Sequence, residues 1–170
     1  STISAYIIIK LVNSAKTVSA AKEKFRQIYE NSTDGIFQTT PDGKFISANP
    51  TLTKIYGYSS SEELIDSIDD IKEKLYVNPN RRSEFIAVME KQGEISQFES
   101  QIYRKDGSII WISENARAVK DANGVLLYYE GTVEDITQRK QTEAILQESE
   151  TKLRMQQMAL MELSKCHPLY

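Results

Sequence analysis

Reactive side chains are scarce in this sequence of 170 residues. It contains one cysteine, Cys166, and one histidine, His167, which are neighbours close to its C-terminal end. A single cysteine excludes an internal disulfide bond and argues against a cysteine-based metal site, and it fits a reducing, cytoplasmic setting. Catalytic triads, phosphate-binding glycine loops and paired metal ligands are also missing from the sequence. We therefore expect no catalytic site, no metal site and no enzymatic activity of the chain itself, and we interpret His167 as a linker residue.

Long hydrophobic runs are missing as well. The longest spans residues 6–9, and Lys10 and Asn13 interrupt its continuation. A membrane-spanning helix needs about 20 apolar residues, so we expect no membrane insertion by this chain. Charged residues make up 26% of the sequence and the net charge is −3. This mildly acidic balance gives no electrostatic reason to expect nucleic acid as a partner.

A helical repeat occupies the first 31 residues. Apolar or small residues recur there in alternating steps of four and three, without glycine or proline, which is the spacing of a coiled coil. We expect Phe25 and Ile28 to fold back on the domain's own sheet, whereas Ile7 and Leu11 reach past the domain and pair with a second copy. The residues predicted for this homodimer interface are Ile7, Leu11, Val18, Phe25 and Ile28.

The middle of the chain has the pattern of an α+β domain. The dipeptides Asp42-Gly43, Asp106-Gly107 and Asn123-Gly124 lie between β-rich runs and favour tight hairpin turns. The runs predict five strands, at residues 35–39, 44–47, 95–104, 108–119 and 125–133. Short helices are predicted between the second and third strands. Two strands followed by several short helices and three more strands form an α+β plan.

Three signals place these short helices. Asn49-Pro50 is typical of a helix start, with an N-cap followed by proline. Ser60 and Glu63 have the spacing of a capping box. Asn78-Pro79 predicts the start of another helix, which ends at Gly93.

A second long helix is predicted from Asp135 to about Lys165. Asp135 and Gln138 have the spacing of a capping box. Leucines then recur every seven residues, but polar residues occupy the alternate positions of the seam (Leu146, Leu153, Leu160; Thr142, Ser149, Gln156). A polar seam is weak and can change its packing at low cost. We therefore divide the chain into an amphipathic, coiled-coil-like helix (1–31), a core (32–137) and a C-terminal signalling helix or linker (138–170).

Five motifs in a fixed order resemble those of PAS domains. They are Phe25-Arg26-Gln27-Ile28-Tyr29-Glu30-Asn31-Ser32-Thr33-Asp34-Gly35-Ile36, Asp42-Gly43-Lys44-Phe45-Ile46-Ser47-Ala48-Asn49-Pro50, Ile55-Tyr56-Gly57-Tyr58-Ser59-Ser60-Ser61-Glu62-Glu63-Leu64, Arg104-Lys105-Asp106-Gly107-Ser108-Ile109-Ile110-Trp111 and Gly131-Thr132-Val133-Glu134-Asp135-Ile136-Thr137. The resemblance covers residues 25–143. It implies a five-stranded antiparallel sheet with short helices on one face, flanked by long N- and C-terminal helices.

The resemblance also implies a function. PAS domains perceive or relay signals in multidomain proteins, so the expected partner is a covalently linked output domain, of histidine-kinase or nucleotide-cyclase type, beyond this chain. The expected relay residues are Asp135, Ile136 and Thr137, which join the last strand to the C-terminal helix. One fold serves many tasks, so the resemblance does not identify a ligand.

Branches of the family that this sequence resembles bind flavin or haem, so these two cofactors are considered. The flavin-adduct branch of the family uses a cysteine on a middle helix, and the haem branch commonly uses a histidine before the third strand; neither residue is present before position 166. We therefore expect no haem and no flavin adduct. A non-covalent small ligand between the helices and the sheet stays open, beside the alternative that the same residues form a packed core. The candidate wall residues are Ile55, Ile71, Leu75, Phe85, Met89, Phe98, Trp111, Tyr129 and Val133.

Overall fold

The structure, a computed structural model, describes residues 2–166 and contains one five-stranded antiparallel sheet. The strands are β1 (Gly35–Thr39), β2 (Phe45–Ala48), β3 (Glu94–Tyr103), β4 (Ile109–Lys120) and β5 (Leu126–Asp135). Their spatial order is β2-β1-β5-β4-β3. The predicted α+β class and the five predicted strands are confirmed. His167 lies outside the described residues.

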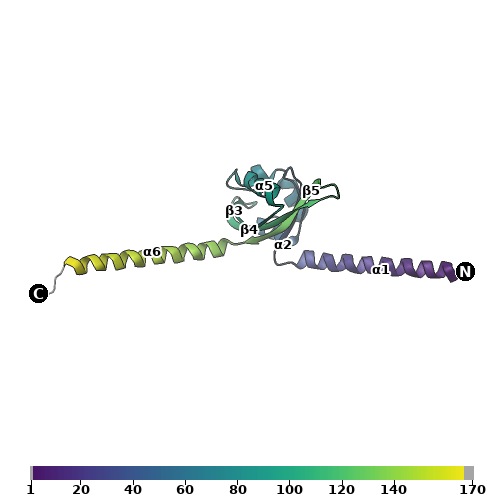
Figure 1. Cartoon of the computed structure of the whole chain (residues 1–170), viewed down its shortest axis with the longest axis horizontal. Coiled ribbons are helices and arrows are strands. Elements are labelled where there is room, and N and C mark those ends of the chain that lie inside the picture. Colours follow the sequence, from purple (N-terminus) through teal and green to yellow (C-terminus); the bar gives the residue numbers. More distant parts are fainter. Residues whose placement is uncertain (1, 167–170) are drawn as a thin grey trace.

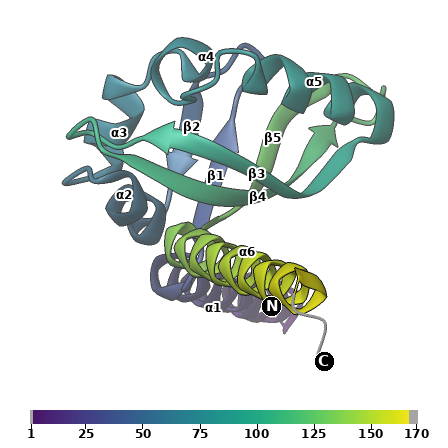
Figure 2. The ribbon, with the colours of Figure 1, turned by 90° about the vertical axis from the view of Figure 1, so that its left-hand side faces the viewer.

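Four short helices cover one face of the sheet: α2 (Pro50–Tyr56), α3 (Ser61–Ser67), α4 (Ile71–Lys74) and α5 (Arg81–Gln92). Figure 2 shows α4 and α5 on this face, whereas the two long helices leave from the opposite side. The core lies between the short helices and the inner face of the sheet. Its most deeply buried side chains, each less than 2% exposed, include Leu52, Leu64, Phe85, Ile102 and Ile112.

Local capping explains where the short helices begin. The Asn49 side chain accepts the Leu52 N–H, as expected for the N-cap of α2. The Ser60 hydroxyl accepts the Glu63 N–H at 3.1 Å and caps α3. The prediction that Asn78 starts a helix is wrong by two residues: its side chain accepts the Asn80 N–H at 3.0 Å. This bond makes a turn ahead of α5, and the helix begins at Arg81.

The two long helices are α1 (Thr2–Asn31) and α6 (Thr137–Cys166). They run away from the core in opposite directions (Figure 1). The expectation that Phe25 and Ile28 fold back on the domain's own sheet is wrong, because these side chains are 68% and 60% exposed. The core holds α1 near its end, where the Asn49 side chain donates to the Tyr29 carbonyl at 3.0 Å. None of the helices that the structure describes is long and apolar enough to cross a membrane.

Candidate functional site

The interior between the short helices and the sheet holds a cavity of about 10 Å³. That volume is about the size of one water molecule. Its lining combines apolar side chains with an unexpected number of polar ones: Phe37, Thr39, Phe45, Tyr56, Ile71, Leu75, Tyr76, Arg82, Phe85 and Glu114. Among the described residues, this interior is a packed core around a small polar centre.

Most of the predicted wall residues lie in the core. Those that are at most 3% exposed are Ile71, Leu75, Phe85, Met89, Tyr129 and Val133. Ile55 and Phe98 are half-buried and pack against this core. Only Ile71, Leu75 and Phe85 of the predicted set line the cavity itself.

Trp111 is a correction to the predicted wall. Side chains alternate between the two faces of a strand, and in β4 the inward positions are Ile110, Ile112 and Glu114, which are at most 6% exposed. Trp111 therefore lies on the outer face, where its ring centroid is 5.2 Å from the Lys140 ammonium. The same alternation in the predicted strand is a signal that identifies Glu114 as an inward carboxyl, which the predicted wall does not include.

Glu114 is a buried carboxyl that makes no ion pair within the described part of the chain. It is 5% exposed, and the Tyr76 hydroxyl donates to its Oε2 at 2.9 Å. Arg82, which is 6% exposed, reaches the Thr40 carbonyl at 3.5 Å. Burial raises the pKa of Glu114 from its ordinary 4.5 to about 7, although the Tyr76 hydrogen bond and the Arg82 charge oppose the shift. The interior thus contains a group that changes charge near neutral pH.

A stability measurement against pH tests this assignment. The raised pKa means that, between about pH 4.5 and 7, folded Glu114 holds a proton that the unfolded chain releases. The free energy of unfolding should therefore fall as pH rises through this window, by about 3 kcal/mol for this group. Glu114→Gln keeps an acceptor for Tyr76 but does not titrate. The free energy of unfolding of this variant minus that of the parent, measured by urea denaturation, should therefore increase by about that amount from pH 5 to pH 8.

Exposed Glu134 provides the matched control for that comparison. Glu134→Gln removes one carboxyl from the same sheet and should follow the parent's pH profile. Parallel profiles for Glu114→Gln and the parent would contradict a raised pKa at Glu114.

The junction between β5 and α6 is held by side chain to backbone bonds. Asp135 Oδ1 accepts the Thr137 N–H at 3.0 Å and its hydroxyl at 2.6 Å. The Thr137 Oγ1 accepts the Trp111 N–H at 3.0 Å, and the Ile136 N–H donates to the Trp111 carbonyl at 2.9 Å. The predicted capping box between Asp135 and Gln138 is corrected: Asp135 bonds to Thr137, and these contacts fix the start of α6 to β4.

A second contact ties the first turn of α6 to β3. Glu99 forms ion pairs with Arg139, at 2.6 Å, and with Lys140. The hydrogen bond from Lys140 and the nearby Arg139 charge lower the pKa of Glu99. Because Glu99 is opposite Ser113 of β4, both sheet contacts of α6 involve the same pair of neighbouring strands.

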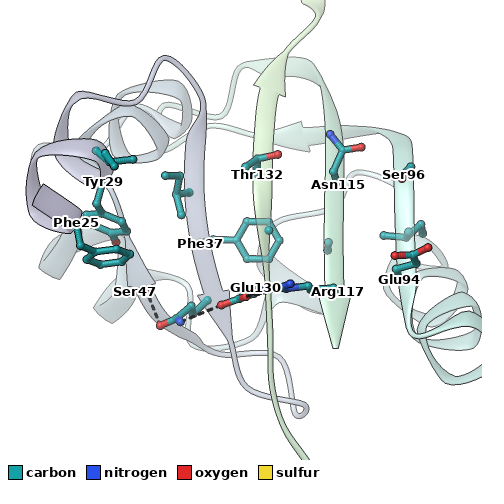
Figure 3. Close-up of a pocket in the computed structure, with 16 residues that line it drawn as sticks. Phe25, Tyr29, Phe37, Ser47, Glu94, Ser96, Asn115, Arg117, Glu130 and Thr132 are labelled. Carbon is teal, nitrogen blue, oxygen red and sulfur yellow. Dashed lines mark hydrogen bonds and ion pairs between the residues drawn. The ribbon is translucent and has the colours of Figure 1, made fainter. Parts of the chain in front are cut away.

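A wide groove lies on the outer face of the sheet. It has a volume of about 740 Å³ and lies between the end of α1 and the strands β1, β5, β4 and β3. Figure 3 shows Phe25 and Tyr29 on one side and Thr132, Asn115 and Ser96 across the sheet. Its polar side chains are joined in a row from Ser47 through Gln38 and Glu130 to Arg117.

The architecture defines a class: a small α+β domain with a closed polar interior and a long helix at each end. A family model described as a PAS domain matches residues 33–138. The chain therefore belongs to the PAS domain family. It is a regulatory sensory module of signal transduction, as predicted from its motifs.

Relatives agree with this assignment. The chain is 26% identical over 137 residues to the probable diguanylate cyclase DgcE of Escherichia coli (strain K12), covering 78% of this chain and 12% of the relative. It is 24% identical over 151 residues to the sensor histidine kinase TmoS of Ectopseudomonas mendocina, covering 85% and 15%. The chain thus spans about an eighth of the length of these curated relatives.

The fold is also that of a solved PAS domain. The PAS domain of a protein from Colwellia psychrerythraea superposes with a TM-score of 0.60 at 26% identity, covering 69% of this chain and 98% of that one.

Proposed function

We propose that this domain relays a change in its interior to α6 through strand β4. The observation that carries the proposal is the position of β4: its inner face presents Glu114 to the cavity, and its Trp111 backbone binds both Ile136 and Thr137 at the start of α6. Only two residues of this strand, Ile112 and Ser113, separate these two contacts. A strand that shifts against its neighbours would therefore move the helix start, which can rotate between alternative packings.

The first test removes the junction carboxylate. Asp135→Ala loses the bonds to Thr137 and the ion pair with Arg104, so we expect the junction to lose about 1 kcal/mol. Hydrogen exchange of residues 137–146 should become faster before the sheet unfolds. Asp121→Ala is the matched control, because Asp121 caps the turn between β4 and β5 through its own carboxylate. Equal protection of 137–146 in Asp135→Ala and the parent would exclude this role of Asp135.

A double substitution separates relay from local capping. Tyr76 contacts the interior carboxyl and Asp135 lies at the junction, so independent sites would give additive effects. We expect Tyr76→Phe to alter the protection of residues 137–146, and this effect to be smaller in the Asp135→Ala background. Strict additivity of the two substitutions would contradict the relay.

We also propose that the chain acts as a homodimer through α1. The predicted interface residues Ile7, Leu11, Val18, Phe25 and Ile28 are between 51% and 68% exposed in the single chain. Such a stripe favours burial against a partner. A second copy is the proposed occupant, because it would bring the same stripe to a symmetric contact.

The output domain and the cofactor state are further proposals. The two curated relatives support an output domain of histidine-kinase or nucleotide-cyclase type beyond this chain. We propose that the interior holds neither haem nor flavin, which is supported by a cavity of about 10 Å³, whereas organic ligands occupy pockets of about 300–1,000 Å³. The purified chain should be colourless, and a visible absorbance band would contradict this. The cytoplasmic setting stays a prediction.

A further inference from the structure

The polar centre of the interior is incompletely satisfied. Thr39 is 2% exposed, and its hydroxyl oxygen has no hydrogen-bond partner among the described residues. Thr39, Arg82 and Glu114 line the same cavity of about 10 Å³. Buried polar groups are normally paired, so this cluster has capacity for a different hydrogen-bond arrangement.

The groups that face Glu114 determine what could drive such a change. The Tyr76 hydroxyl, from the segment between α4 and α5, is its hydrogen-bond donor. The charge of Glu114 also acts on the Tyr56 hydroxyl of α2. Arg81 and Arg82 of α5 act on the carboxyl at a distance. Strands β1 and β5 contribute the neutral Thr39 and the phenol Tyr129, whose ring lies 5.7 Å from the Arg82 guanidinium.

The two arginines differ in how firmly they are held. Arg81 forms an ion pair with Glu84 and donates to the Glu99 carbonyl at 2.7 Å. Among the described residues, Arg82 has one hydrogen bond, the 3.5 Å contact with the Thr40 carbonyl, which is at the long limit for such bonds. Its guanidinium also lies over the Phe85 ring, 5.1 Å from the ring centroid. Arg82 is therefore the cation that can turn toward a newly charged Glu114.

We propose that the ligand sensed by this interior is the proton, bound and released by the Glu114 carboxyl, with Arg82 as the group that responds. This inference rests on the proposed relay, for which it names the signal. In the acidic state Glu114 is neutral and the cavity stays as described. When the proton leaves to solvent, the carboxylate requires a charged partner or water in the interior. Arg82, and with it the start of α5, moves toward β4.

The charge change lies close to the output side of the domain. Glu114 is opposite Val133 of β5 and Phe98 of β3. Phe98 neighbours Glu99, which holds Arg139 and Lys140 of α6. Val133 is two residues ahead of Asp135 in the same strand. A rearrangement around the carboxylate therefore has short covalent paths to both contacts that fix α6.

Carbon-13 and nitrogen-15 NMR titration from pH 5 to pH 9 tests the proposal on the full chain. We expect one glutamate carboxyl resonance with a midpoint near pH 7, and backbone amides of Trp111 and Thr137 that shift with the same midpoint. In Glu114→Gln both signals should lose this transition. A His167→Gln background is used throughout, because the one histidine of the chain titrates in the same range.

Tyr76→Phe provides a second variant with a signed expectation. The Tyr76 bond lowers the pKa of Glu114, so its removal should move the carboxyl midpoint to higher pH. A Glu114 midpoint below pH 5 would overturn the proposal, and so would amide shifts that persist in Glu114→Gln.

The outcomes distinguish a failure of the proton proposal from a failure of the relay proposal. If the carboxyl titrates but the Trp111 and Thr137 amides do not follow, the proton is not the relayed signal and the inference fails. The additivity test on Tyr76 and Asp135 judges the relay separately, because it is performed at one pH.

Discussion

Asn49→Asp is expected to destabilise the domain severely, although it only replaces the side-chain amide NH2 group with an oxygen atom of similar size. Asn49 is fully buried, and its Oδ1 accepts the N–H groups of Ile36, at 2.8 Å, and Leu52, at 2.9 Å. Its Nδ2 donates to the carbonyls of Tyr29 and Asp34, each at 3.0 Å. One side chain thus joins α1, the start of β1 and the N-terminus of α2.

Aspartate can make only half of these bonds. Its carboxylate accepts from both N–H groups but would face the two carbonyls without a donor. Each buried polar group left unpaired costs about 1–3 kcal/mol, so urea denaturation at pH 7 should show a loss of roughly 2–6 kcal/mol. The end of α1 should also exchange hydrogen faster, because the Tyr29 carbonyl is one of the two lost partners.

Asn78→Asp is the matched control. Asn78 is exposed, and its side-chain oxygen accepts the Asn80 N–H at 3.0 Å, a bond that aspartate can also accept. We expect a change within about 0.5 kcal/mol. Similar losses in the two variants would contradict the bridging role of Asn49.

These two asparagines also mark how far the sequence predicts the structure. The N-cap role of Asn49 is local, since Pro50 follows and Leu52 is three residues away, and it was predicted. Its bonds to Tyr29 and Asp34 span 20 and 15 residues and depend on how the chain folds back. Asn78 was predicted as a helix start because Pro79 follows it. Its side chain instead closes a turn. Whether such an asparagine caps a helix or closes a turn depends on the backbone conformation of the residues that follow it.

The candidate site shows the same division. The residues of the β5–α6 junction were predicted from their motif, and their sequence neighbours set most of the geometry. The contacts of Thr137 with Trp111 and of Glu99 with Lys140 were not predicted, because they cross between strands of unknown register. Trp111 is one of the predicted wall residues, although alternation in β4 points it outward and Glu114 inward. The alternation of side chains along β4 can be predicted from the sequence. The small size of the cavity cannot, because it depends on how the side chains pack.

The dimer proposal predicts the other large effect. Ile7 and Leu11 are 51% and 65% exposed and lie more than four turns from the end of α1 at Asn31, beyond the reach of the domain's own sheet. Burying such a side chain stabilises by roughly 1.5–3 kcal/mol. A symmetric interface would bury four of them, so replacing Ile7 and Leu11 with aspartate should remove roughly 6–12 kcal/mol of association. A micromolar complex has about 8 kcal/mol in total.

Sedimentation at micromolar concentration distinguishes α1 from α6. The double variant Ile7→Asp, Leu11→Asp should be monomeric, whereas Leu153→Asp should weaken the dimer only modestly. Leu153 is 56% exposed, close to the exposure of Ile7, so a difference between the variants would come from the partner and not from the single chain. The seam of α6 is interrupted by Thr142, Ser149 and Gln156, which weakens its pairing.

Lys16→Asp completes the comparison. Lys16 lies on the face of α1 opposite the apolar stripe, at position f of the repeat, so this variant adds an aspartate to the same helix and should remain a dimer. A parent chain that sediments as a monomer would contradict the proposal, and so would a larger effect from Leu153→Asp than from the α1 variant. If α1 pairs firmly and α6 weakly, a movement at the Asp135–Thr137 junction meets little resistance from the α6 seam and can be transmitted along that helix.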